Sequence, residues 1–168
     1  GQSDWAVVKV SRPSDDYVCV RGGAPDPKEP VWGMGFPASA ARRHHSSEGN
    51  RKYATNGRLS PNGFFDNAWL KAAGLSEEIV RQLGAFYGDR TLWTDADAYT
   101  GMSGGGLFDS SGRALGVYSV IMVDGQLSGN VGAHQAYYAG SNGYLKMSHV
   151  LSEAKALLGE EGFRAAFA

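Results

Sequence analysis

The chain has 168 residues, with 16 basic and 17 acidic side chains and a formal net charge of −1. This length suits one domain with a real core and is too short for two large ones. A charge so close to zero gives no electrostatic footprint for nucleic acid or an anionic membrane, so neither is an expected partner. The use of 24 glycines against 6 prolines favours short strands joined by tight turns, and therefore an all-β chain.

The first thirty residues predict two strands and a linker. Residues 5–10 and 17–20 are short runs rich in valine, which is typical of strands. Residues 21–30, "RGGAPDPKEP", contain three prolines and two glycines and are not expected to pair in a sheet. We therefore expect a boundary here, with residues 1–30 as one unit and residues 31–168 as the main domain.

The middle of the chain changes its hydrophobic period. Residues 31–36 and 52–59 predict strands, and the second is closed by the turn sequence Ser-Pro-Asn-Gly. A helical insertion is expected near residues 64–90, because Ser76 is a suitable cap and two glutamates follow it in the first turn. The periodicity places four apolar side chains on the inward face of this helix: Ile79, Val80, Leu83 and Phe86.

The last third alternates short apolar runs with turns and ends in a helix. Residues 106–108, 114–123 and 144–147 predict strands, with turns at residues 109–112 and at the Asp124-Gly125 pair. A closing helix is expected over residues 148–158, with a serine cap and Gly159 as its stop. Its inward side chains are expected to be Val150, Leu151, Ala154, Leu157 and Leu158.

Ser103 stands among glycines in a pattern that two unrelated architectures use for a nucleophile. Gly101-x-Ser103-x-Gly105 formally matches the elbow of α/β-hydrolases, and Asp124 and His149 follow in the required order. However, the preceding "TDADAYT" is too polar for a central parallel strand, and the following "GGLFDSSG" is rich in turn residues where a helix should begin. The context favours a loop that leads into a β-hairpin.

The segment "GMSGGGLFDSSGRALGVYS" resembles the G-x-S-G-G segment of chymotrypsin-like serine peptidases, especially the HtrA-like and glutamyl-endopeptidase-like bacterial branches. Further segments are similar to this family in the same order: "SDWAVVKV", "WGMGFP", "TDADAYTGMSGG" and "NGYLKMSHVLSEAKALL". The resemblance implies a chymotrypsin-like double β-barrel. Residues 1–30 would be the end of the first barrel and the linker, and residues 31–168 the second barrel with its helical insertion and closing helix.

The resemblance also implies a set of functional residues. Ser103 would be the nucleophile and Asp4 the residue that orients the catalytic histidine. The backbone N–H groups of Gly101 and Ser103 would form the oxyanion hole, with Met102 as a further candidate. The substrate-binding residues would be Ala98, Tyr99, Thr100, Tyr118, Ser119 and Val120, although Tyr118 can equally be a core residue.

Two positions depart from the family pattern. Met102 replaces the more usual asparagine or aspartate before the nucleophile, and Gly106 stands where proline or alanine is common. Both changes leave the backbone donors in place. Asp97 lies close enough in sequence to reach the base of a specificity pocket, although it can equally be a turn residue. The default expectation is a small or apolar side chain before the scissile bond.

The catalytic histidine of this family precedes the aspartate, and here Asp4 is the fourth residue. We therefore expect the histidine on an N-terminal segment, or on a separate N-terminal fragment of the same protein that stays bound by strand pairing. The four histidines of the chain are explained more simply as loop or helix residues: His44, His45, His134 and His149. Adjacent histidines in extended chain point opposite ways, so no metal site and no cofactor is expected.

Two functions from different classes follow from these expectations. The first is a serine endopeptidase that hydrolyses peptide bonds through an acyl-enzyme on Ser103, with a peptide or protein as substrate. The alternative is a catalytically inactive pseudo-peptidase that binds a peptide or partner protein. The resemblance to exported bacterial enzymes implies a secreted or periplasmic location.

Overall fold

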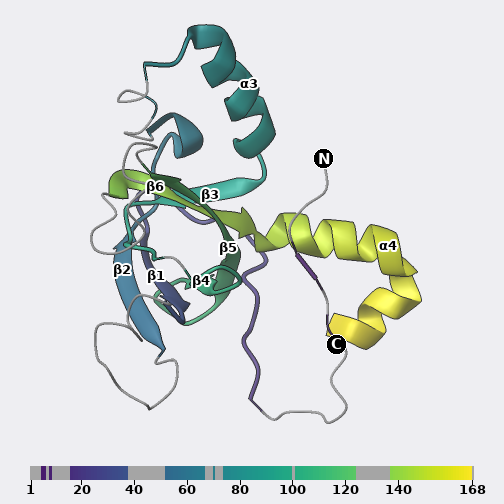
Figure 1. The fold of residues 1–168 in the computed structure, drawn as a ribbon. Coiled ribbons are helices and arrows are strands. Elements are labelled where there is room, and N and C mark those ends of the chain that lie inside the picture. Colours follow the sequence, from purple (N-terminus) through teal and green to yellow (C-terminus); the bar gives the residue numbers. More distant parts are fainter. Residues whose placement is uncertain are drawn as a thin grey trace.

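The computed structural model describes residues 5–6, 8, 16–37, 52–66, 70, 74–99, 101–123 and 137–167, with the backbone alone at 120–123 and 137–141. In these ranges a six-stranded antiparallel sheet has the order β2-β1-β4-β5-β6-β3, and two α-helices lie outside it (Figure 1). The elements in chain order are β1 Pro30–Gly35, β2 Tyr53–Arg58, the 3-10 helix η1 Gly63–Asp66, α3 Glu77–Tyr87, β3 Thr91–Thr94, β4 Gly106–Phe108, β5 Ala114–Val123, β6 Tyr137–Lys146 and α4 Met147–Phe167.

The sheet curls until its two outer strands meet. Leu59, just after β2, forms an antiparallel bridge with Thr94 at the end of β3. The Ser60 N–H donates to the Trp93 carbonyl at 2.8 Å, and the Thr94 hydroxyl donates to the Arg58 carbonyl at 2.9 Å. At this end the hydrogen-bonding groups of the two outer strands therefore pair with one another. This pairing removes the exposed edge that an open sheet would present.

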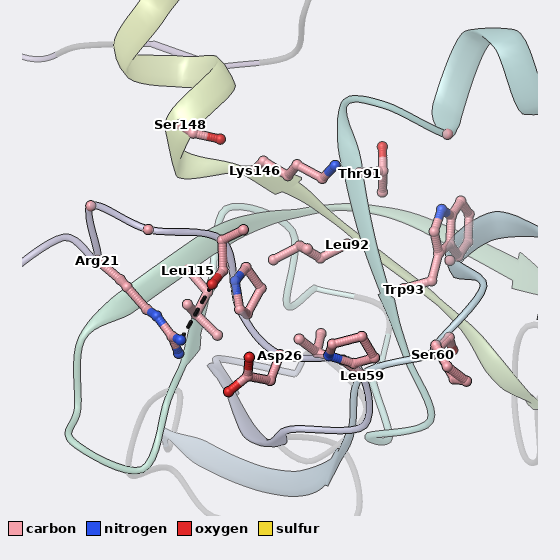
Figure 2. A pocket seen from close by; sticks show the side chains of 18 residues that line it. Arg21, Asp26, Leu59, Ser60, Thr91, Leu92, Trp93, Leu115, Lys146 and Ser148 are labelled. Carbon is pink, nitrogen blue, oxygen red and sulfur yellow. Dashed lines mark hydrogen bonds between the residues drawn. The ribbon is translucent and has the colours of Figure 1, made fainter.

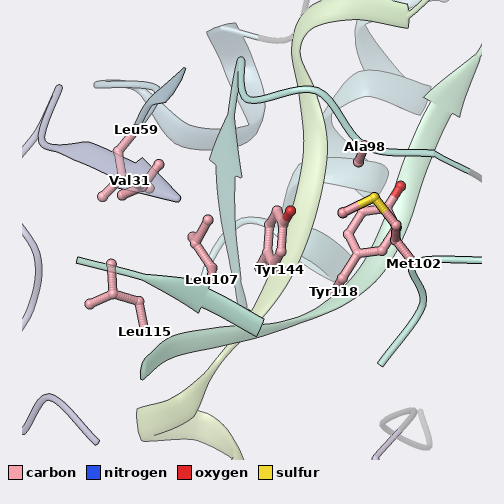
Figure 3. Close-up of a cluster of buried hydrophobic side chains, with 8 residues drawn as sticks. All are labelled: Val31, Leu59, Ala98, Met102, Leu107, Leu115, Tyr118 and Tyr144. Atoms are coloured by element: carbon pink, nitrogen blue, oxygen red, sulfur yellow. The ribbon is translucent and has the colours of Figure 1, made fainter. Parts of the chain in front are cut away.

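The apolar core fills the inside of the curled sheet. It consists of Val31, Leu59, Ala98, Met102, Leu107, Leu115, Tyr118 and Tyr144 (Figure 3). Alternate residues of β1 are buried, as expected for a strand with one face on a core. Gly33 is needed for close approach, because a Cβ at this position would lie 2.5 Å from the Tyr144 hydroxyl oxygen.

A second apolar cluster joins the insertion to the sheet. Phe64, Leu70 and Trp93 are buried there, and α3 contributes Val80, Leu83 and Tyr87. The Ser76 cap is confirmed, since its hydroxyl accepts the Ile79 N–H at 3.4 Å.

The prediction of which α3 side chains face inward is only partly correct. Ile79 is 44% exposed and Phe86 is 50% exposed. Gly84 is buried instead, and a Cβ on it would come within 2.7 Å of the Phe65 ring. The missing side chain at Gly84 lets the aromatic ring approach the helix. The buried stripe therefore follows Val80, Leu83, Gly84 and Tyr87.

The strand expected at residues 17–20 is wrong. This segment makes a single parallel bridge, between Val20 and Ala114, and Tyr17 is 82% exposed. Valine-rich composition favours a strand only where a partner covers one face, and none of the described residues does so here. Residues 5, 6 and 8 are also outside any strand, while the rest of residues 5–10 lies outside the described ranges. Residues 21–29 contain no strand, as predicted, but Pro30, which was expected to stay unpaired with them, begins β1 and pairs with Arg58.

Helix α4 begins at Met147, so Ser148 lies in its first turn instead of capping it as expected, and the helix bends at its predicted stop. Gly159 has φ 69° and ψ 173°, which interrupts the helix, and helical turns then continue to Phe167. Val150 and Ala154 are buried as expected, but Leu157 is 77% exposed, because α4 extends away from the sheet (Figure 1). None of the helices in the described ranges is long and apolar enough to cross a membrane.

Candidate active site

Two consecutive tight turns present Ser103. The Met102 N–H donates to the Tyr99 carbonyl at 3.0 Å, and the Gly105 N–H donates to the Met102 carbonyl at 2.8 Å. In each turn the third residue is a glycine with positive φ, 96° at Gly101 and 82° at Gly104, as in a type II turn. A Cβ disfavours this conformation, so the glycines flanking the Met-Ser pair are required by the backbone itself.

The loop is fastened to two strands. The Gly104 N–H donates to the Tyr118 carbonyl at 3.0 Å, and the Tyr118 N–H donates to the Gly105 carbonyl at 2.7 Å. On the other side, a Cβ on Gly105 would overlap the Met34 carbonyl oxygen of β1. The position of the loop is therefore set by its contacts with β5 and β1.

Met102 anchors the loop in the core. Its side chain is 1% exposed and packs in the same cluster as Ala98 and Tyr118 (Figure 3). A Cβ on Gly35 would lie 3.0 Å from the Met102 Cβ, so β1 also packs closely against it. This explains the departure from the family pattern, because an apolar side chain at this position fills the end of the barrel interior.

Ser103 is exposed between these anchors. Among the described residues no hydrogen bond is recorded for its hydroxyl, nor for the backbone N–H groups of Gly101 and Ser103. The Met102 N–H is already bonded to Tyr99, so it is not available to an oxyanion in this conformation. Of the three N–H groups expected to bind an oxyanion, two therefore have no hydrogen-bond partner among the described residues.

The segment before the loop alternates inward and outward side chains. Ala96 and Ala98 are fully buried, whereas Asp97 is exposed. The Asp97 carbonyl accepts the Thr55 hydroxyl at 2.6 Å, which ties this segment to β2. The Asp97 carboxylate therefore lies on the outer face, as expected of a turn residue and not of a pocket base.

Beyond Tyr118, β5 changes its pairing. Its bonds to β4 end at Val117, and the register with β6 shifts between Tyr118 and Val120, which leaves Ser119 in an irregular position. Bulges of this kind redirect the backbone and are common beside active sites. On the β4 side no strand among the described residues pairs with β5 past this point. This open stretch of β5, residues 119–123, begins directly beside the Ser103 loop, residues 101–105.

Several expected site residues lie outside the described ranges. These are Asp4, Thr100, His44, His45 and His134. The Nε2 atom of His149, in the first turn of α4, lies 3.2 Å from the Glu153 Oε1 atom. The Trp5 indole, adjacent in sequence to Asp4, donates to Glu153 Oε2 at 2.6 Å. Across the described residues no cluster of three histidine, cysteine or acidic side chains could hold a metal ion.

The sequence profile of the trypsin-like peptidase domain matches residues 1–117, which is more than half of the chain. The chain therefore belongs to the trypsin-like peptidase domain family, and the family resemblance inferred from its motifs is confirmed.

Solved structures with a similar fold include two of the Rv3671c protease. A serine-to-alanine mutant from M. tuberculosis H37Rv, in an inactive form, is 19% identical, with a TM-score of 0.49 over 85% of this chain and 54% of that chain. The inactive form of the protease is 20% identical, with a TM-score of 0.49 over 84% of this chain and 55% of that chain. The chain thus spans about half the length of these structures. No curated protein sequence matches it.

Sequence reasoning singled out the glycine-rich loop around Ser103 but missed the residues that hold it in place. The paired backbone of Tyr118 and the close approach of Met34 are contacts between distant segments. The run of glycines from 104 to 106 was the available signal, because such a run often marks close backbone approach.

Proposed function

We propose that this chain carries the nucleophile of a serine endopeptidase and that Ser103 forms the acyl-enzyme. The observation that carries the proposal is the double turn, which exposes Ser103 and leaves the N–H groups of Gly101 and Ser103 without partners among the described residues. Two adjacent backbone donors beside an exposed hydroxyl are what a tetrahedral oxyanion requires.

The proposed reaction follows from these groups. The Ser103 oxygen attacks the peptide carbonyl carbon while an imidazole takes the hydroxyl proton. The carbonyl oxygen becomes an oxyanion and accepts hydrogen bonds from the two N–H groups. The imidazolium then gives its proton to the leaving amine, the C–N bond breaks, and a Ser103 ester remains. Water hydrolyses this ester by the same sequence of steps.

We propose that an N-terminal segment, or a bound N-terminal fragment, supplies the histidine and that Asp4 fixes its tautomer. The likeness to exported bacterial enzymes supports a secreted or periplasmic location.

The open stretch of β5 supports a substrate that binds as an added strand. Its backbone at Ser119 and Val120 would pair with the residues before the scissile bond. Tyr99 and Thr100 would line the side of the specificity pocket, whereas the Ala98 side chain is fully buried in the core. The outward direction of Asp97 supports a small or apolar residue before the scissile bond, because no acidic group from this segment faces inward.

Labelling with a fluorophosphonate tests the proposal on the intact protein that contains this chain. We expect one adduct, mapped by peptide mass spectrometry to Ser103, and no adduct after Ser103→Ala. The matched control is Ser110→Ala, since Ser110 is exposed in the turn between β4 and β5. An unlabelled Ser103, or full peptidase activity in Ser103→Ala, would leave the peptide-binding pseudo-peptidase as the function.

A further inference from the structure

A cavity of about 480 Å³ lies on a different part of the barrel from the nucleophile loop. It is enclosed by the linker residues 21–27 on one side and by β3 and the junction of β6 with α4 on the other (Figure 2). None of residues 101–105 lines it. Its volume falls within the range of small-molecule sites, roughly 300–1,000 Å³.

One rim of the cavity is cationic and rich in hydroxyl groups. The Lys146 ammonium group lies beside Thr91, and the Ser148 hydroxyl points toward the same rim (Figure 2). Lys146 is half-buried, and among the described residues no ion pair is recorded for it. Ser148 belongs to the first turn of α4, where the helix dipole also favours negative charge. This rim therefore suits a carboxylate.

The opposite rim carries an acid. Asp26, an exposed residue of the linker, lines the cavity, and no ion pair is recorded for it among the described residues (Figure 2). Its backbone is fixed, because its N–H donates to Glu29 Oε2 at 2.9 Å and its carbonyl accepts the Glu29 N–H at 3.1 Å. Arg21 also borders the cavity, but its guanidinium is paired with Glu29 at 2.5 Å and with Asp109 at 3.6 Å.

The floor between the two rims is apolar. Leu59, Leu92 and Leu115 point into it from three different strands or strand ends (Figure 2). A ligand that satisfies all three regions has a carboxylate at one end, an ammonium group at the other and apolar side chains between them. Burial of these side chains against the floor would supply the affinity, and the two charges would fix the orientation.

We propose that this cavity binds a short peptide of two or three apolar residues with free termini. Its terminal carboxylate lies at Lys146, Thr91 and Ser148, and its amino group lies at Asp26. The cavity shares no lining residue with the nucleophile loop, so this site is independent of the acylation chemistry proposed for Ser103.

Calorimetric titration of the intact protein carrying Ser103→Ala tests the site without hydrolysis of the ligand. The probes are leucyl-leucine, its C-terminal amide and its N-acetyl derivative. We expect leucyl-leucine to bind and either modification to weaken binding about tenfold or more. In Lys146→Met the acid and the amide should bind equally, and in Asp26→Asn the free and the acetylated amine should bind equally. Lys52→Met is the matched control and should change nothing, because Lys52 is exposed and lies outside the cavity.

The proposal is overturned if the three probes bind the unmodified cavity equally, or if leucyl-leucine gives no heat at millimolar concentration. It is also overturned if Lys52→Met weakens binding as much as Lys146→Met. The three probes are compared on the same protein, so this comparison remains valid even if a substitution in the cavity disturbs folding. Failure of this titration leaves fluorophosphonate labelling of Ser103 unaffected, so the two proposals fail separately.

Discussion

Gly101 determines which way one peptide group of the nucleophile loop faces. The turn closed by the bond from Met102 to Tyr99 has a positive φ, 96°, at its third residue. The commoner type I turn closes the same bond with a negative φ there, and its middle peptide is rotated by about 180°. In that alternative a carbonyl oxygen would replace the Gly101 N–H. The sign of one backbone angle therefore decides whether an oxyanion meets a donor or an acceptor.

We expect Gly101→Ala to favour the alternative turn, since a Cβ at positive φ costs about 1–2 kcal/mol. Loss of one oxyanion donor should lower kcat by about 10²–10³. Steady-state kinetics on a peptide substrate would measure this loss.

The matched control is Gly74→Ala. Gly74 also has a positive φ, 59°, and a Cβ there meets no atom within 4 Å. It should lose similar stability and keep its kcat. Equal kinetic losses in the two variants would contradict the role assigned to Gly101.

At the scale of elements, Asp109 joins the hairpin of β4 and β5 to the linker. Its carboxylate accepts the N–H groups of Ser111 at 2.9 Å and Arg113 at 3.0 Å and the Arg113 Nε–H at 2.9 Å. Burial raises the pKa of the Asp109 carboxyl, but these hydrogen bonds outweigh burial and hold the pKa below its usual value. A lowered pKa means that the folded state favours the ionised form. The ionised carboxylate therefore stabilises the fold fully at pH values above the pKa of Asp109 in the unfolded chain. This stabilisation is lost as the pH falls through the pKa of Asp109 in the folded state.

Asp109→Asn should therefore reduce the free energy of unfolding at pH 7 by roughly 2 kcal/mol, since it removes charge-assisted bonds to a buried group. The difference from the parent protein should begin to shrink as the pH falls below about 4, where the Asp109 carboxyl of the unfolded chain becomes protonated, and should shrink further as the pH falls through the lower pKa of the folded state. Urea unfolding at several pH values measures both effects. Asp89→Asn, at an exposed site, is the control. A difference that stays constant with pH would contradict the prediction.

Strands with strong local signals could be predicted from the sequence, and those that depend on partners could not. β1, β2, β4 and β5 were expected because alternation and turn residues mark them. β3 was missed, since its four residues carry too short a pattern and its pairing with β6 involves residues about fifty positions away. The false strand at residues 17–20 has the same cause. Its composition favoured a strand, but pairing decides whether one forms.

At the scale of the whole molecule, a seam closes the barrel between β2 and β3. Gly57 lies at this seam, and a Cβ on it would overlap the Ala96 backbone nitrogen. The Arg58 N–H donates to the Asp95 carboxylate at 2.6 Å beside it. The segment that leads to the nucleophile loop begins here. Closure of the barrel and placement of the loop therefore depend on the same contacts.

Gly57→Ala should open this seam, because a backbone atom cannot move aside as a flexible side chain can. We expect a loss of about 3 kcal/mol in the free energy of unfolding and faster amide hydrogen exchange at Ser60 and Asp95, whose N–H groups cross the seam. Asn56→Ala, at the exposed neighbouring position of β2, should have little effect on either measurement. Unchanged exchange in Gly57→Ala would show that the seam does not depend on this glycine.

The sequence motif correctly predicted that Ser103 lies on a glycine-rich loop, which is exposed, but it did not predict the closure of the barrel. Residues 59 and 94 come together through the fold of the intervening chain, and no local pattern records that contact. Met102 shows the same limit, because its burial depends on Gly35 and Tyr118.

Met102 also couples the packing of the interior to the position of Ser103. Its thioether fills space inside the barrel, while the next residue along the chain is exposed to solvent. A substitution that changes the volume around Met102 is therefore expected to move the backbone of Ser103 as well.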